Sequence, residues 1–378
     1  MQAFASFSWG HGSFQMTEWL INYSGGFVRR GLPGSIAGIL SDATGIRANV
    51  LVIAASFASF TALTIWLLRH ASGLFPAILI LSCVVMGIPA YQDSIVRKDC
   101  LGLLLFLGCL TAWDSKAASV WRLAVVNLIA IAGILCHETF AFYALPAMVI
   151  FSKGAGPGFK GHARRAILLA PAAAGFLITI VFHGTPALAK AVNDSWLPLW
   201  RSIEPGNPAI ATPAAAIEAI GWTSQQGLSL AIHMWTSGPY QPAAWTFVFV
   251  VSFFLFLLFT GRSSEQGTET RIRVAGILFT QLVFISPLFL LGVDYGRWLF
   301  LLVVSTMILA AGGRSAPRWI EERIRSIFEV AGLDRVFIAV PAKDWILLLF
   351  GVPVCWNLIN FLTASPLGKH IDLIRSWL

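Results

Sequence analysis

Two adjacent arginines, Arg29 and Arg30, are the first residues in the chain whose type and spacing could do chemistry. They lie between glycines in the segment NYSGGFVRRGLPG, residues 22–34. Glycine allows unusual backbone angles and close approach of the backbone to a ligand, and a planar guanidinium matches two phosphate oxygens at once. The segment is a candidate phosphate site. The alternative is an interfacial turn whose arginines hold lipid headgroups.

Charged residues recur at three further places, each beside an apolar stretch. They are YQDSIVRKD (91–99), with Asp93, Arg97, Lys98 and Asp99; CHE (136–138), with His137 and Glu138; and DYGRW (294–298), with Asp294 and Arg297. Ionisable groups at membrane depth are costly and are usually paired or functional. Each group also has a purely structural explanation. Charges three or four residues apart, such as Asp294 and Arg297, can form a local ion pair.

These residue types suit transfer of a group from a phosphate leaving group to a hydroxyl. The candidate catalytic residues are Asp294, Glu138, His137 and Asp99, and the candidate ligands of a lipid phosphate are Arg29, Arg30, Arg97, Lys98 and Arg297. As the proton-accepting base we favour Asp294, then Glu138, then Asp99. A zinc site is not expected, because no second histidine stands at the i, i+4 spacing of HExxH. No cofactor is assigned, and a divalent metal would be compatible with the chemistry without being required.

Composition indicates what must position these residues. Hydrophobic residues make up 57% of the 378-residue chain and charged residues 12%, against about 25% charged residues in soluble domains. The chain is therefore predicted to be an all-α, polytopic integral membrane protein that forms a single domain, 1–378. The predicted transmembrane or re-entrant helices, about ten in number, are 49–68, 73–90, 100–113, 119–135, 138–152, 165–183, 243–260, 274–292, 298–312 and 345–363.

Lys and Arg gather in the cytoplasmic loops of membrane proteins, which sets the orientation. With the basic segments 153–165 and 314–343 placed inside, 16 of the 26 basic residues fall in cytoplasmic loops. The net charge of +8 thus has a topological explanation, and no nucleic-acid partner is predicted. Within 314–343, apolar residues at helical spacing among Glu and Arg predict a cytoplasmic interfacial helix and loop.

The same alternation puts all the charged clusters on the outer face. Arg29 and Arg30 then lie outside, with no signal peptide or span before them. Either the chain begins outside or an upstream span is missing before Met1, and the second is favoured. The segment 184–242 becomes a large extracytoplasmic loop, too long for a plain connector. Its tryptophans suit stacking on sugars or the membrane interface, so it is a candidate lid; they are Trp196, Trp200, Trp222 and Trp235.

In this layout the chain resembles polytopic enzymes that assemble cell-surface glycans on the outer side of the bacterial membrane. These include GT-C glycosyltransferases, Wzy-like polysaccharide polymerases and O-antigen ligases. GT-C enzymes carry an acidic motif in the first outer loop, after the first span. Here the nearest acids are Glu18 and Asp42, so the resemblance leaves the base unassigned. Similarity to the Wzy type implies outer arginines on a lipid pyrophosphate, here Arg29, Arg30, Arg97 and Arg297.

The resulting expectation is a glycosyltransferase or polymerase of the bacterial inner membrane. Its donor would be a sugar linked to polyprenyl phosphate or pyrophosphate, its acceptor a glycan or lipid, and membrane lipids would surround it. One alternative is a transporter or flippase for an anionic lipid-linked sugar, although no internal repeat is visible and the charges crowd one face. Another is a membrane acyltransferase acting on surface polysaccharide, which would also use an outer histidine and carboxylate.

Overall fold

A computed structural model of the protein describes residues 10–84, 96–115, 119–151, 158–236, 242–261, 267–292, 294–340 and 344–350. Within these ranges every regular element is an α-helix or a short 3-10 helix, and none is a strand. The all-helical prediction is therefore confirmed. Most of the apolar stretches expected from the sequence coincide with one helix over their described part, whereas 165–183 is divided between two helices that end at Leu168 and begin at Ala170; 73–90, 138–152 and 345–363 are described only partly.

Two helices in the described part of the chain are long and apolar enough to cross a membrane, α4 (Ala48–His70) and α17 (Gly267–Leu291). A third candidate is the pair α10 (Phe159–Leu168) and α11 (Ala170–Val181), if the 62° bend between them lies within one span. Only 28% of the apolar stretch of α4 is buried, as expected for a helix that faces lipid. These helices suggest membrane association, and the number of ten spans stays a prediction.

The chain divides into two compact units. Unit 1 comprises Met1–Ala62 and Ser94–Leu228, and unit 2 comprises Leu63–Asp93 and Ser229–Leu378. Helices α4 and α15 (Ser224–Thr236) begin in unit 1 and end in unit 2. The single integral domain expected from the sequence stays a prediction.

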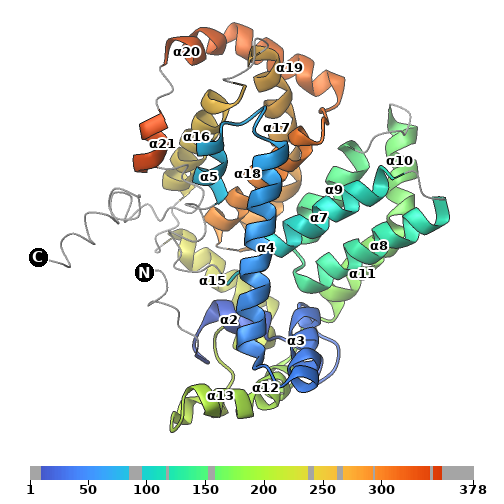
Figure 1. Ribbon diagram of the computed structural model, residues 1–378, viewed down its shortest axis with the longest axis vertical. Coiled ribbons are helices and arrows are strands. Elements are labelled where there is room, and N and C mark those ends of the chain that lie inside the picture. Colours follow the sequence, from blue (N-terminus) through green and yellow to red (C-terminus); the bar gives the residue numbers. More distant parts are fainter. Residues whose placement is uncertain are drawn as a thin grey trace, which may run out of the picture. The chain divides into compact units, whose positions relative to one another are not determined.

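Unit 1 contains a helical bundle formed by α7 (Asp99–Trp113), α8 (Ser119–Cys136), α9 (Phe140–Phe151), α10 and α11 (Figure 1). Helices α7 and α8 pack against each other and only five residues separate them in the chain, so they run antiparallel. The Cys109 thiol lies 3.7 Å from the carbonyl oxygen of Val126. Three residues, His137 to Thr139, separate α8 from α9. The start of α7, the end of α8 and the start of α9 therefore lie at one end of the bundle.

A buried asparagine stabilises the break between α10 and α11. Asn127 of α8 donates a hydrogen bond to the carbonyl of Leu168 at 3.0 Å. Its side-chain oxygen accepts one from the backbone N–H of Ala172 at 3.2 Å. Backbone groups freed by a helix break in an apolar setting need such partners. The amide of Asn127 thus supplies the polar contacts that permit the bend.

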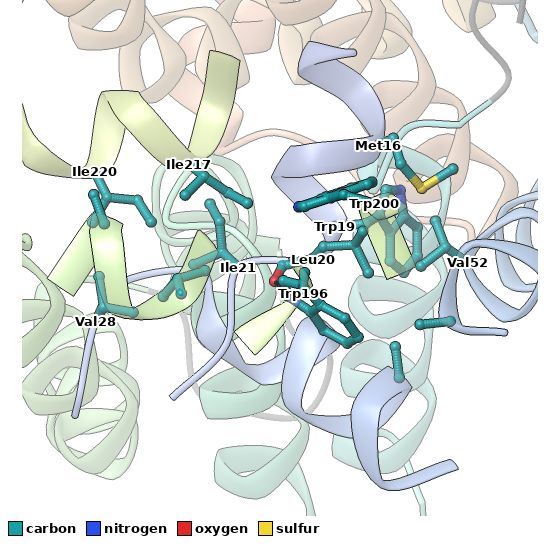
Figure 2. Packing of buried hydrophobic residues seen from close by; sticks show 14 of the residues in the cluster. Met16, Trp19, Leu20, Ile21, Val28, Val52, Trp196, Trp200, Ile217 and Ile220 are labelled. Atoms are coloured by element: carbon teal, nitrogen blue, oxygen red, sulfur yellow. Dashed lines mark hydrogen bonds between the residues drawn. The ribbon is translucent and has the colours of Figure 1, made fainter. Parts of the chain in front are cut away.

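Unit 1 has a second core, built mainly from the N-terminal segment and residues 186–221, to which Val52 of α4 also contributes (Figure 2). The N-terminal part supplies α2 (Phe14–Trp19) and α3 (Gly31–Thr44). The other part supplies five elements: α12 (Pro186–Ser195), α13 (Leu197–Ile203), η1 (Pro208–Ala211), α14 (Ala215–Glu218) and η2 (Ala219–Gly221). We call residues 186–221 the cap, because its side chains cover α2.

Hydrogen bonds join the cap to the N-terminal segment. The indole N–H of Trp196 donates to the carbonyl of Leu20 at 2.6 Å, and Asn22 donates to Ser195 at 2.9 Å. Trp200 is fully buried in the same core and Trp196 is 8% exposed. These two tryptophans are core residues, so neither is available to stack on a sugar. The segment expected as an outer loop is thus largely helical.

Unit 2 is built around α18 (Tyr295–Ala311), a helix in which all residues but the last are buried. Its other complete helices are α5 (Ala77–Val84), α16 (Pro242–Phe259), α17, α19 (Arg318–Val330), α20 (Leu333–Ala339) and α21 (Asp344–Phe350). The segment 314–343 therefore contains a helix, as its pattern predicts. Ile324 and Phe328 of α19 are buried, whereas Trp319 and Ile327 are exposed.

Candidate functional site

Six ionisable side chains from distant parts of the chain meet in unit 1. They come from the end of α2, the loop before α3, the residue that precedes α7, and the turn between α8 and α9. This Arg30 cluster consists of Glu18, Arg29, Arg30, Lys98, His137 and Glu138. With the histidine neutral, its three cations and two carboxylates leave a formal charge of +1. The cluster can therefore accept an anion.

Arg30 joins the two carboxylates of the cluster. Its Nε donates to Oε2 of Glu138 at 2.7 Å and its Nη2 donates to Oε1 of the same residue, which makes a bidentate pair. Its Nη1 donates to Oε1 of Glu18 at 3.2 Å. Such forked, charge-assisted contacts are strong and fix geometry. The Glu138 side chain is therefore held in one orientation.

His137 lies between the same two carboxylates. Its Nε2 is 3.1 Å from Oε1 of Glu18, and its Nδ1 is 3.6 Å from Oε2 of Glu138. The backbone N–H of Thr139 donates to Nδ1 at 3.2 Å. A nitrogen that accepts a hydrogen bond carries no proton in the neutral ring, so the network assigns the proton to Nε2, which donates to Glu18. His137 thus orients Glu18.

Lys98 attaches the start of α7 to the end of α2. Its ammonium donates to the carbonyl oxygen of Glu18 at 2.8 Å, and the side chain is almost completely buried. Burial lowers the pKa of Lys98 to about 8, although the nearby Glu18 carboxylate opposes the shift. At neutral pH this amine is still mostly charged. It contributes positive charge to a site shielded from solvent.

Glu138 is held in its ionised form. Burial alone would raise its pKa, but the positive charge of Arg30 and the hydrogen bonds from Arg30 prevail, so the pKa lies well below its ordinary value. Arg29 adds to this effect from 3.8 Å. Its side chain is 32% exposed, against 20% for Arg30. Arg29 is therefore both more weakly paired and more open to a ligand.

Glycines permit the backbone that carries both arginines. A Cβ at Gly34 would lie 2.2 Å from the carbonyl oxygen of Ile21, and one at Gly25 would lie 2.7 Å from Ala191 of the cap. Arg30 itself adopts a left-handed conformation, with φ of 64°, at the N-cap of α3. Non-glycine residues rarely adopt this conformation, and they do so mostly where surrounding contacts require it. Here the two carboxylates hold the Arg30 side chain.

The structure brings together five of the residues expected from the sequence: Arg29, Arg30, Lys98, His137 and Glu138. Arg97 and Asp99 flank Lys98 and are buried. Asp294 and Arg297 belong to unit 2, where they are 3.5 Å apart and form the ion pair that their spacing suggests. Asp93 lies outside the described residues.

Glu18 is the member of the cluster that the sequence does not single out as a catalytic or phosphate-binding candidate. It is fully buried and contacts Arg30, His137 and, through its carbonyl, Lys98. One signal in the sequence points to it: Glu18 is the single acidic residue among the first 41, and it stands in the apolar run MTEWLI. A lone acid in such a setting is expected to be paired.

Within the described ranges, no group of three or more His, Cys, Asp or Glu residues is arranged to hold a metal ion. What the cluster offers instead is guanidinium and ammonium groups for an anion, with carboxylates beside them for a proton. Comparison of the chain with protein-family models, with curated proteins and with solved structures finds no match.

Proposed function

We propose that the protein is a multi-pass glycosyltransferase or polysaccharide polymerase of the bacterial inner membrane. Its donor would be a sugar linked to polyprenyl phosphate or pyrophosphate, used at the outer face. The observation that carries this proposal is the Arg30 cluster: a net-positive set of side chains beside carboxylates, at the ends of the apolar helices α7, α8 and α9. A phosphate at this position would have its lipid tail among apolar helices.

In this proposal Arg29 and Arg30 bind the phosphate leaving group. Charge develops on that group as the bond to the sugar breaks, and fixed cations stabilise it most in the transition state. Lys98 adds positive charge from a buried position. Arg29 makes the first contact, because its side chain is the more exposed of the two arginines.

Glu138 would accept the proton of the acceptor hydroxyl. While Arg30 holds both of its oxygens, its pKa is too low for an effective base. A donor phosphate that binds Arg30 competes for the same N–H groups. Release of Glu138 then raises its pKa and makes it a better proton acceptor. Donor binding and activation of the base are thereby coupled, and Glu18 keeps Arg30 in place through the third contact.

The experiment is native mass spectrometry of the detergent-purified protein, with wild type beside Arg29→Gln and Lys190→Gln. Lys190 is an exposed cation of unit 1, and its one ion pair within the described residues is with Asp194. Its variant therefore controls for the loss of a positive charge. Wild type and Lys190→Gln should retain a co-purified polyprenyl phosphate that Arg29→Gln loses. Ordinary phospholipids in equal amounts on all three would refute the proposal.

A second measurement separates catalysis from transport. Glu138→Gln should retain the lipid and lose sugar transfer to acceptor by about 10²–10⁴-fold, the range expected when a general base is removed. Lipid movement across proteoliposomes without any transfer product would instead favour the flippase alternative.

A further inference from the structure

We infer that Tyr23 is a further ligand-contacting residue of this site, whose phenolic hydroxyl donates a hydrogen bond to an oxygen of the phosphate group held by Arg29 and Arg30. The inference rests on the proposed function and adds a residue to it. Tyr23 lies in the loop between α2 and α3, and neither its sequence context nor its spacing distinguishes it from an interfacial anchor.

The first observation is the state of the hydroxyl. The Tyr23 oxygen is buried and has no hydrogen-bond partner among the residues that the structure describes. Most buried side-chain polar atoms do have a partner, and an exception calls for an explanation such as an absent ligand. A phenol that only packed its ring would serve equally well as phenylalanine.

The second observation is where the ring lies. A Cβ at Gly31 would be 2.3 Å from the Tyr23 ring and 3.0 Å from Cζ, the atom that bears the hydroxyl. The ring thus rests directly against the residue that follows Arg30. The electrostatic influence of the Cys136 thiol, the residue before His137, also reaches the Tyr23 hydroxyl. The ring that carries the unpartnered oxygen therefore lies against the chain neighbour of Arg30.

The ring is also held in place before any ligand arrives. It stacks on Phe27 with 5.6 Å between ring centroids and 12° between planes, and Phe27 in turn packs edge-on against Phe182 at 5.9 Å. The Tyr23 backbone N–H donates to Ser35 at 3.1 Å. A donor fixed in this way loses little freedom when a ligand binds.

The chemistry of the hydroxyl selects the class of ligand. Burial raises the pKa of Tyr23 to about 12, with a smaller contribution from Cys136. The group is therefore a neutral O–H throughout the physiological pH range. As a neutral group it does not compete with an anionic ligand for the arginines. Beside two guanidinium groups, such a donor suits an acceptor-rich anion. A phosphate monoester or diester fits, and either a lipid or a soluble molecule could carry it.

The test compares wild type, Tyr23→Phe, Arg29→Gln and Tyr143→Phe in detergent. Tyr143 is a buried tyrosine of the same unit whose ring packs on Phe106 and Phe140, so its variant removes the same single atom elsewhere. Binding of farnesyl phosphate, inorganic phosphate and farnesol is measured by calorimetry, and unfolding is measured without ligand.

Tyr23→Phe should bind farnesyl phosphate about tenfold more weakly, the loss of one hydrogen bond to a charged group. Its unfolding temperature should not fall, because the hydroxyl has no protein partner to lose. Tyr143→Phe should bind like wild type, and farnesol should not bind. Affinity for inorganic phosphate equal to that for farnesyl phosphate, with the same loss in Tyr23→Phe, would support the contact and identify the ligand as a soluble phosphate.

Two results would overturn the inference alone: binding by Tyr23→Phe equal to wild type while Arg29→Gln loses it, or a clear drop in the unfolding temperature of Tyr23→Phe. No binding of either phosphate by wild type would overturn the proposed function and the Tyr23 contact together.

Discussion

The pair Arg30–Glu138 should be the strongest single side-chain interaction in unit 1, and a double-mutant cycle can measure it. The variants are Arg30→Met, Glu138→Gln and the double variant. Arg30→Met removes three donors and leaves the carboxylates of Glu138 and Glu18 without them. Glu138→Gln keeps the shape of that side chain but removes its charge, and Arg30 keeps its contact with Glu18.

The magnitude follows from burial. The paired side chains are only 20% and 18% exposed, so solvent screens them little. Stranding a buried charge costs about 3–5 kcal/mol, which we expect for Arg30→Met. Loss of the charged acceptor in Glu138→Gln should cost about 2 kcal/mol. Since both variants break the same contact, the double variant should be more stable than the sum predicts, with a coupling energy of about 2 kcal/mol.

The assay is reversible unfolding in mixed detergent micelles, followed by tryptophan fluorescence. The matched control is the cycle for Lys190 and Asp194, an i, i+4 pair of the same unit with side chains 64% and 41% exposed. That pair should couple by about 0.3–0.5 kcal/mol. A coupling energy for Arg30 and Glu138 no larger than that of the control would refute the reasoning.

Three further predictions concern the same region. Gly31→Ala should destabilise the protein by about 2 kcal/mol in denaturant titrations, because the added Cβ would overlap the ring of Tyr23. The control Gly12→Ala, whose Cβ would have no atom within 4 Å, should change stability little. Equal losses in the two variants would count against the packing argument. The pKa of Glu138 is depressed from 4.5. Its contribution to the free energy of unfolding is therefore present above about pH 4.5 and is lost as pH falls toward the folded-state pKa. In an acid titration, the stability of Glu138→Gln should fall less steeply than that of wild type. Folding lowers the pKa of Lys98 from 10.5 to about 8. Between these two pH values the unfolded chain binds one proton more than the folded protein, so the free energy of unfolding rises with pH. Lys98→Met should abolish that rise.

The helices could be predicted from the sequence because each follows from a local property. Apolar runs bounded by charged or glycine-rich segments predict helices, and the structure has helices at these places. The candidate site could be predicted in the same local way. Charged residues at the ends of apolar runs are costly unless they are used. This rule selects Arg29, Arg30, Lys98, His137 and Glu138, but equally Arg97, Asp99, Asp294 and Arg297.

The pairing of those charges could not be predicted, since it depends on contacts between residues far apart in the chain. Arg30 and Glu138 are separated by 108 residues, and His137 and Glu18 by 119. The sequence favours Asp294 as the base, because its short turn keeps it close to apolar spans. In the structure it forms an ion pair with Arg297, three residues away.

The position of Glu18 shows why the cap matters to the site. Contacts with Arg30 and His137 fix the side chain of Glu18. The cap in turn fixes α2, through the packing of Trp200 and the hydrogen bond from Trp196 to the carbonyl of Leu20. The sequence suggests a lid whose tryptophans face a sugar. The buried positions of Trp196 and Trp200 indicate another role: the cap fixes the helix that supplies the second carboxylate. In the proposed function, Arg30 would then keep one fixed partner when a donor phosphate displaces Glu138.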